Sequence, residues 1–389
     1  MVHMKTIEVK KDIYWVGAID WDLRNFHGYL TQRGSTYNAY LIIDEKIVLV
    51  DTVKHYLYDE MLERIKKIVD PSKIDYIISN HVEMDHSGCI PKILQLCPNA
   101  TVITSPQGEK GLRQHYKQDW NFQVVKSGDN VNIGKRNITF LQTPMIHWPD
   151  NMVSYIPEEK IIFSNDAFGQ HMATSERFDD EVQYSTIIEE ARKYYANIVL
   201  PYGTQVQKVM EEVRKLDIEI IATSHGIIWR KYIPDIIEQY DKWSKNETDK
   251  KVVIVYDTMW NSTKKMADTI KSAFESKDYT ICMYNLQATH ISDIMTELIT
   301  AEYICVGSPT LNSGVLPTVA AFLTYLKGLA PKNRKAIAFG SYGWAPLSIK
   351  EIEETLKSAG FDVVGTEKIN YVPSEEDLEG LRGRVEGLI

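Results

Sequence analysis

The sequence predicts an α/β protein of two domains. Roughly the first 245 residues alternate strand-like and helix-like segments, and a polar, charged stretch follows at 242–250. The apolar run at 251–256 opens a second alternation, and its unbroken apolar character is typical of a strand buried in a parallel sheet. The length of 389 residues suits two or three domains. We therefore expect domains at 1–248 and 249–389, the second a doubly wound parallel sheet.

The composition is that of a folded globular protein. Hydrophobic residues form 44% and charged residues 25% of the chain, which excludes a disordered or collagen-like protein. The formal net charge is −9, and an acidic chain without a basic block is a poor candidate for binding nucleic acid. No apolar run approaches the ~20 residues of a membrane helix. The opening residues, Met1 to Lys5, contain no apolar core of a secretory signal.

The four cysteines, at 89, 97, 282 and 305, form no CxxC pair. Their spacing excludes a cysteine-built zinc ribbon, a rubredoxin-type iron site and a thioredoxin-type redox pair within this chain. A disulfide framework is not expected at this length, so the sequence favours the reducing cytoplasm.

The first domain is expected to interleave strands and helices. A hairpin is expected at 37–43 and 46–51, then a helix at 56–69 and a strand at 75–79 that leads to His81. Further strands are expected near 101–104, 122–125, 137–143, 152–156 and 160–164, and further helices near 181–195, 204–215 and 233–244.

The second domain is expected to be a five-stranded doubly wound sheet. Its predicted strands lie near 251–256, 280–284, 302–307 and 335–341, with helical segments between them.

Four possible metal ligands stand within six residues, in the segment His81-Val82-Glu83-Met84-Asp85-His86. Because the segment directly follows a strand, we expect it in a loop at a sheet edge. Imidazole and carboxylate ligands suit iron, zinc or manganese. In an extended stretch His81, Glu83 and Asp85 share one side, and His86 turns toward a second metal. Two adjacent ions use these ligands better than one tetrahedral ion does.

Three further candidates, His147, Asp166 and His225, each stand beside a turn former at the end of a predicted strand. Taken alone, each histidine fits a buried, hydrogen-bonded side chain, and Asp166 fits a turn or cap residue. The segment at 81–86, taken alone, fits a charged helix cap. The four segments together favour a metal site.

The combined pattern resembles the metallo-β-lactamase fold and, more narrowly, the flavodiiron proteins. Most hydrolases of that fold have histidine at the position of Glu83. A carboxylate there makes the ligand set harder and more anionic, which favours iron. The resemblance implies an N-terminal αββα sandwich with a non-haem diiron site.

The resemblance also assigns the ligands. It implies that His81, Glu83 and His147 hold the iron nearer the flavin and that Asp166 bridges the two irons. The ligands that it implies for the other iron are Asp85, His86 and His225.

The family places a histidine and a tyrosine beside the substrate pocket. His27 and Tyr195 match those positions and are expected to donate protons or hydrogen bonds to bound oxygen or nitric oxide. For His171, a structural role and a functional role are equally compatible with the sequence.

In the second domain, a hydroxyl-rich loop joins the strand at 251–256 to a helix. Backbone N–H groups and the helix dipole at such a junction attract an anion. Thr258, Ser262 and Thr263 add hydroxyl donors, and the loop has neither Lys nor Arg. The Walker pattern is absent, so a monophosphate fits better than a triphosphate. Taken alone, this loop fits an ordinary Ser/Thr-capped helix.

Two more loops, at 307–314 and 340–345, leave the carboxyl ends of predicted parallel strands, where doubly wound sheets bind ligands. Their small residues admit a flat ring, and Trp344 or Trp260 can stack on it. The three loops resemble those of flavodoxin, with Asn261 where many flavodoxins have glycine, and imply an FMN site. The residues expected to bind FMN are Thr258, Met259, Trp260, Asn261, Ser262, Thr263, Ser308, Pro309, Thr310, Leu311, Asn312, Ser341, Tyr342, Gly343 and Trp344.

The resemblance covers essentially the whole chain and implies an oxidoreductase. Two ferrous ions and reduced FMN together supply four electrons, enough to reduce dioxygen to water, and two irons can hold two molecules of nitric oxide for coupling to nitrous oxide. The sequence leaves the choice between the two gases open. The family implies a head-to-tail homodimer or a dimer of dimers, and an external electron donor: rubredoxin first, reduced deazaflavin second. No dinucleotide-binding fingerprint argues for NADH.

Two alternatives belong to other classes. One is a dizinc metallo-hydrolase with an appended flavodoxin-like module, against which Glu83 and a redox cofactor both argue. The other is a pure electron carrier with a scaffold-only metal domain, against which the complete ligand set argues.

Overall fold

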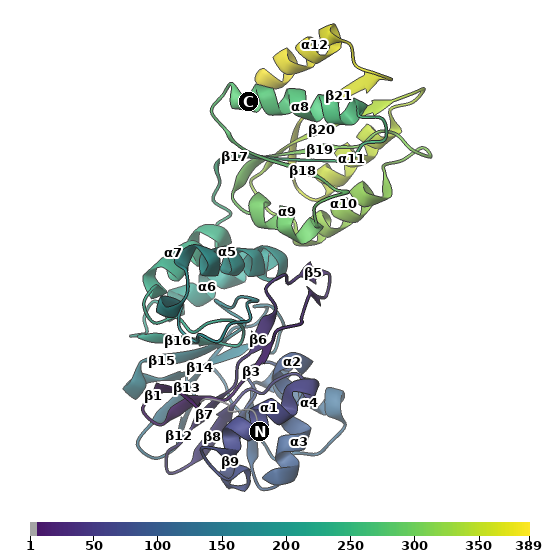
Figure 1. Ribbon diagram of the computed structural model, residues 1–389. Helices are drawn as coiled ribbons and strands as arrows, with labels where there is room; N and C mark the ends of the chain where they lie inside the picture. The colour runs from purple at the N-terminus through teal and green to yellow at the C-terminus, as the bar shows by residue number, and fades with distance from the viewer. Residues whose placement is uncertain (1–5) are drawn as a thin grey trace. The chain divides into compact units, whose positions relative to one another are not determined.

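The computed structural model describes residues 6–389, and the start of the chain, in which no secretory signal is expected, lies largely outside the described residues. The chain divides into two compact units (Figure 1). The first contains the described part of Met1–Tyr194 together with Thr204–Asp241, and the second contains Tyr195–Gly203 and Lys242–Ile389. No helix among the described residues has both the length and the apolar character to cross a bilayer.

The first unit is built on two sheets. The seven-stranded sheet runs in the spatial order β1 (Ile7–Lys10), β2 (Ile13–Trp15), β7 (Tyr40–Ile42), β8 (Ile47–Val50), β9 (Ile74–Ile78), β10 (Thr101–Thr104) and β11 (Phe122–Val124). The five-stranded sheet runs in the order β12 (Asn130–Asn132), β13 (Asn137–Gln142), β14 (Met152–Ile156), β15 (Ile161–Asn165) and β16 (Ile220–Thr223).

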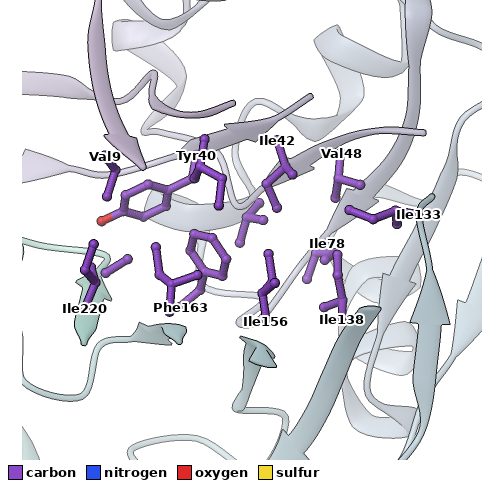
Figure 2. Close-up of a cluster of buried hydrophobic side chains, with 14 of the residues drawn as sticks. Val9, Tyr40, Ile42, Val48, Ile78, Ile133, Ile138, Ile156, Phe163 and Ile220 are labelled. Atoms are coloured by element: carbon purple, nitrogen blue, oxygen red, sulfur yellow. The ribbon is translucent and has the colours of Figure 1, made fainter. Parts of the chain in front are cut away.

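The two sheets face one another across an apolar core (Figure 2). Tyr40 and Val48 project from the seven-stranded sheet toward Ile156 and Phe163 of the five-stranded sheet. Since successive side chains of a strand alternate in direction, Leu41 of β7 points to the other face and joins a separate core cluster. Both faces of this sheet are therefore buried.

Helices cover the outer faces. The second cluster includes Met61, Ile93 and Leu112 from helices packed on the seven-stranded sheet, and α5 to α7 lie on the side of β15 and β16 (Figure 1). The αββα sandwich is thus confirmed. Its helices are α1 (Tyr58–Lys66), α2 (Met84–Ser87), α3 (Ile90–Leu96), α4 (Pro106–Tyr116), α5 (Tyr184–Tyr194), α6 (Gly203–Val213) and α7 (Ile233–Ser244).

Two short antiparallel strand pairs, which the sequence did not indicate, lie between β2 and β7 along the chain. β3 (Ala18–Asp20) pairs with β6 (Ser35–Tyr37), and β4 (Asn25–Phe26) pairs with β5 (Tyr29–Leu30). His27 occupies the turn between β4 and β5, with a φ of 51°.

The second unit is a five-stranded parallel sheet in the order β18-β17-β19-β20-β21, as a doubly wound fold requires. This architecture is confirmed. Its strands are β17 (Asp249–Tyr256), β18 (Thr280–Asn285), β19 (Ala301–Gly307), β20 (Lys335–Tyr342) and β21 (Asp362–Asn370). Its helices are α8 (Ser262–Glu275), α9 (Ile291–Leu298), α10 (Pro317–Leu329), α11 (Leu347–Ser358) and α12 (Glu375–Glu386).

Candidate functional site

The ligand candidates of the first unit come from loops at one edge of the sandwich. His81 follows β9, His147 follows β13, Asp166 directly follows β15, and His225 follows β16. The expectation that His81, Glu83 and Asp85 form an extended stretch is wrong. α2 begins at Met84, with Glu83 as its N-cap, so Asp85 turns away from Glu83 along a helix.

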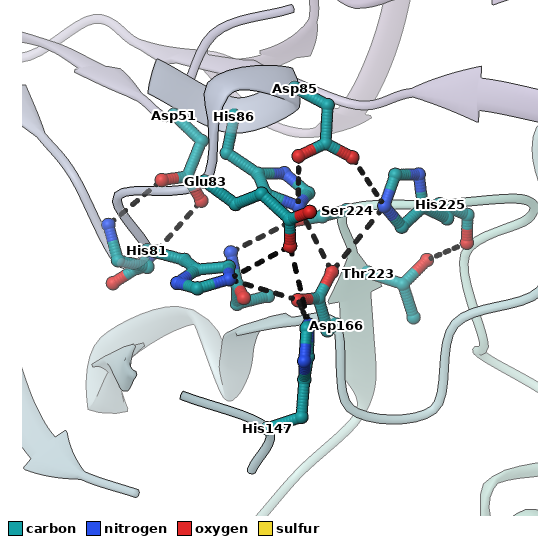
Figure 3. Close-up of polar contacts among 12 residues, drawn as sticks. Asp51, His81, Glu83, Asp85, His86, His147, Asp166, Thr223, Ser224 and His225 are labelled. Carbon is teal, nitrogen blue, oxygen red and sulfur yellow. Dashed lines mark hydrogen bonds and ion pairs between the residues drawn. The ribbon is translucent and has the colours of Figure 1, made fainter. Parts of the chain in front are cut away.

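The structure brings the histidines together around Asp166 (Figure 3). One carboxylate oxygen of Asp166 lies 3.1 Å from Nε2 of His86 and 3.4 Å from Nε2 of His225. The other oxygen lies 3.3 Å from Nε2 of His147 and 3.7 Å from Nε2 of His81. Asp166 therefore stands between two groups that can each hold a metal ion.

A second carboxylate joins each group. Glu83 Oε2 lies 3.4 Å from Nε2 of both His81 and His147. The two oxygens of Asp85 lie 3.4 Å from Nε2 of His86 and of His225, one oxygen to each ring. Among the described residues, neither group includes a cysteine.

The polar atoms at the centre are arranged for cations. Both carboxylate oxygens of Asp85 and of Asp166, and Nε2 of His81 and of His86, are buried and make no hydrogen bond with any described residue. Their close contacts are the ion pairs among these same side chains, and burying so many polar atoms without hydrogen bonds is costly. Two metal ions would satisfy them, and mixed imidazole and carboxylate donors suit iron.

The charges agree with this interpretation. Burial alone raises the pKa of Asp166, but the facing His86, His147 and His225 hold that pKa well below its usual range. Burial opposes protonation of His147 and His225, yet Asp166 with Glu83 or Asp85 raises their pKa values to about 9 and about 10. Without metal, protons on the histidines balance the negative charge of the carboxylates. Metal binding would release these protons, and the metal ions would then supply the positive charge.

Outer contacts orient two of the rings. Nδ1 of His81 lies 2.9 Å from Oδ2 of Asp150, which also accepts the Val82 amide at 2.7 Å. Nδ1 of His225 lies 2.8 Å from the carbonyl oxygen of Thr36. Such contacts fix which nitrogen faces a metal. The sequence did not single out Asp150 or Thr36 as partners of these histidines. The position of Asp150, close after His147, was the one feature that could have drawn attention to it.

Of the two residues expected beside the pocket, His27 lies next to the first group. Its Nε2 is 3.3 Å from Oε1 of Glu83, and its side chain is 75% exposed.

Of the two adjacent tyrosines at the end of α5, Tyr194 lies beside the histidines. The Tyr194 ring lies 5.1 Å from the ring of His171 and 6.0 Å from that of His225. Burial and then the Asp166 carboxylate raise the pKa of Tyr194 well above its usual range. The Tyr195 ring instead packs 5.3 Å from Trp243 in the second unit.

His171 is a buried, neutral neighbour of the site. Its Nδ1 lies 2.7 Å from Oγ of Ser35, and its ring lies 4.8 Å from the ring of His225. Burial and the charge of His225 lower its pKa well below the usual range.

The second unit holds a cavity of about 560 Å³ at the carboxyl ends of β17, β19 and β20. This volume is typical of a cofactor site. Trp260 and Trp344, 86% and 94% exposed, lie at this cavity and are free to stack on a flat ring. The lining also includes residues that the sequence did not single out, Ser313, Ala345, Leu347, Tyr371 and Val372.

The loop before α8 is arranged for a phosphate. Oγ1 of Thr258 is buried and makes no hydrogen bond within the described chain. Asn261 adopts a φ of 66°, which permits the turn into α8, and Ser262 begins that helix. Oγ1 of Thr263 lies 3.2 Å from Oγ of Ser341, joining the first loop to the third. Of the other predicted residues, Ser308 is buried beneath the second loop, and Met259, Pro309, Thr310, Leu311, Asn312, Tyr342 and Gly343 line the cavity.

Comparisons with known proteins cover both units. Residues 36–226 match the family described as ODP family beta lactamase, and residues 254–382 match flavodoxin. The chain is 44% identical to a nitric oxide reductase of Moorella thermoacetica, over 96% of this chain and 95% of that protein.

Two solved structures are similar over nearly the full length. The rubredoxin oxygen:oxidoreductase of Desulfovibrio gigas is 42% identical, with a TM-score of 0.97, over 99% of this chain and 98% of that one. The flavodiiron protein of Giardia intestinalis is 34% identical, with a TM-score of 0.96, over 100% of this chain and 97% of that one.

Proposed function

This chain belongs to the flavodiiron protein family, and from that premise we propose which residues form its diiron site and which form its FMN site. The chain is an oxidoreductase with FMN and a non-haem diiron site. It reduces dioxygen to water, nitric oxide to nitrous oxide, or both. The observation that carries the proposal is Asp166, whose two oxygens face two separate ligand groups.

The proposed ligands follow the two groups. His81, Glu83 and His147 would hold one iron, and Asp166 would contribute one oxygen to each group. Asp85, His86 and His225 would hold the other iron. When loaded, the two irons and the flavin supply up to four electrons, the number that dioxygen needs to become water. The outer contacts from Asp150 and Thr36 keep Nε2 of His81 and His225 aimed inward.

The flavin is proposed to bind in the cavity of the second unit. Its phosphate would lie at the N-terminus of α8, held by backbone N–H groups and the hydroxyls of Thr258, Ser262 and Thr263. Its ring would lie between the loops after β19 and β20, where Trp260 and Trp344 provide stacking surfaces.

Two side chains are proposed to serve the bound gas. His27 borders the first ligand group through Glu83, and the Tyr194 ring packs against His171 and near His225. Both can donate a hydrogen bond or a proton at the ligand pocket. Reduction of either gas consumes protons, which donors at this position would supply.

Further parts of the proposal concern organisation. We place the diiron domain at 1–248 and the FMN domain at 249–389. We propose a cytoplasmic head-to-tail homodimer, or a dimer of dimers, fed by rubredoxin or a reduced deazaflavin. A relative of this chain is named a rubredoxin-oxygen oxidoreductase, which supports rubredoxin as the first donor to test.

The direct test uses anaerobically purified, iron-replete protein. We expect about two irons and one FMN per chain, and consumption of dioxygen or nitric oxide when reduced rubredoxin is supplied. Two zincs and esterase activity would point to a hydrolase instead. Flavin with metal but no reduction of either gas would point to an electron carrier.

Replacing Glu83 by histidine should shift the metal preference. Glu83→His exchanges a carboxylate for an imidazole in the group of His81 and His147. When iron and zinc are supplied equally, we expect a higher zinc-to-iron ratio than in the wild type and a loss of gas reduction of about tenfold or more. Elemental analysis and gas consumption measure both effects. Glu83→Gln, which keeps an oxygen donor, is the control; unchanged iron and activity in Glu83→His would contradict the assignment.

Tyr194 and Tyr195 provide a matched pair. Tyr194→Phe removes the hydroxyl of the tyrosine that packs beside His171 and His225, so we expect the turnover number to fall by about tenfold or more. Tyr195→Phe changes a ring packed on Trp243 and should leave turnover close to that of the wild type. Iron and FMN contents are measured for both variants. Equal effects, or a larger effect at Tyr195, would contradict the role assigned to Tyr194.

A further inference from the structure

A small apolar cavity lies behind two of the loops that carry the proposed iron ligands. It has a volume of about 20 Å³ and lies between the apolar face of α6 and strands β14 and β15. Its walls include Ile146, Val153, Ile162, Ala167, Val206 and Met210. All of these residues belong to the first unit.

The cavity suits an uncharged molecule better than water. Its volume exceeds the roughly 10–15 Å³ that one water-sized sphere requires, but a buried water also needs two to four polar partners. Two of the three polar side chains at the wall, Ser164 and Tyr240, hydrogen-bond to backbone groups of the same loop. Oγ of Ser164 donates to the Ala167 carbonyl at 2.8 Å, and the Tyr240 hydroxyl accepts the Phe168 amide at 2.7 Å. Apolar cavities of this kind stay dry and take up apolar gases.

The cavity shares its walls with the ligand-bearing loops. Ile146 directly precedes His147, and Ala167 directly follows Asp166. The cavity and the ligand groups thus lie against the same two loops.

The apolar face of α6 forms one wall of the cavity. Val206, Val209, Met210 and Val213 follow the helical spacing of three and four residues and all line the cavity. Val206 and Met210 are only 2% exposed, whereas Val209 is half-buried at the surface.

We infer that this cavity binds a small, uncharged diatomic gas and supplies it to the diiron site. The identity of the gas rests on the proposed function. The inference that the cavity binds a gas rests on the cavity alone. Dioxygen and nitric oxide have the same relevant chemistry here: both are small, neutral and weakly solvated.

Xenon is the probe that tests binding without turnover. Crystals of the iron- and FMN-loaded protein under xenon pressure should show xenon between α6 and β15. Val206→Ile adds one methylene to the wall, and xenon binding should fall by about tenfold or more. Val153→Ile is the second variant, in case the first does not fold. Val124→Ile, on the 41% exposed Val124 of β11, is the matched control and should bind xenon as the wild type does.

Steady-state kinetics tests whether the cavity supplies gas to the diiron site. In the variant that no longer binds xenon, the KM for the gas should rise several-fold. The iron content, the FMN content and the kcat at saturating gas should stay unchanged. Absence of xenon from the wild type, or loss of xenon with an unchanged KM, would overturn the inference. If the loaded wild type reduces neither gas, the proposed function fails and the supply role fails with it, while the xenon density still decides whether the cavity binds gas.

Discussion

Asp166→Asn is expected to lower the iron content of the purified protein from about two to one or fewer per chain and to reduce gas consumption by at least about 100-fold. The reason is geometric, because one Asp166 oxygen faces His86 and His225 while the other faces His147 and His81. The amide keeps the shape of the side chain but loses its charge and presents one oxygen instead of two. Iron analysis and gas consumption after anaerobic purification measure the effect.

Asp179→Asn is the control for removing a buried carboxylate. Asp179 is fully buried and accepts backbone amides of Lys231 and Tyr232 at 3.0 and 2.6 Å, outside both ligand groups. We expect it to lower stability while leaving about two irons per chain. Two irons and near-normal activity in Asp166→Asn would refute the bridging role.

Ser262→Asp is expected to weaken FMN binding by about 100-fold or more while leaving the apoprotein at least as stable as the wild type. Ser262 begins α8, is 7% exposed, and lines the flavin cavity. A carboxylate at a helix N-terminus stabilises the helix by about 0.3–1 kcal/mol, so the fold should tolerate the change. The same carboxylate would lie beside the proposed phosphate, and such a like-charge contact costs several kcal/mol. FMN titration by fluorescence and thermal unfolding of the apoprotein separate the two effects.

Ser262→Asn is the neutral control, since it adds a side chain of the same size without charge. It should lose far less FMN affinity than the aspartate variant does. Equal FMN affinities for the two variants would place the phosphate away from the α8 N-terminus.

The sequence predicted most strands of the three large sheets, because many of them carry apolar runs bounded by turn residues, but it missed β1, β2, β12, β16 and β21. It did not predict the strand pairs β3–β6 and β4–β5, whose strands are two or three residues long and too short for any periodicity. It also predicted an extended segment where α2 begins at Met84. Four residues of helix give no periodic signal, and alternating His81, Glu83 and Asp85 fit a strand equally well.

Tyr194 and Tyr195 show a similar limit at the site. Two adjacent tyrosines near the end of a helix are equivalent in sequence. Only the direction of α5 and the turn that follows it decides that Tyr194 packs against His171 while Tyr195 packs against Trp243.

The sequence predicted the types of the candidate ligands, their order and their places at strand ends, because the donor chemistry belongs to individual side chains. Only the tertiary structure determined the distances between these side chains. His81 and Asp150 stand 69 positions apart and their side chains meet at 2.9 Å, while His225 and Thr36 stand 189 positions apart and meet at 2.8 Å. Many buried polar residues can provide such contacts. Which of them does so depends on how two sheets pack face to face, and that packing depends on apolar side chains distributed over the whole domain.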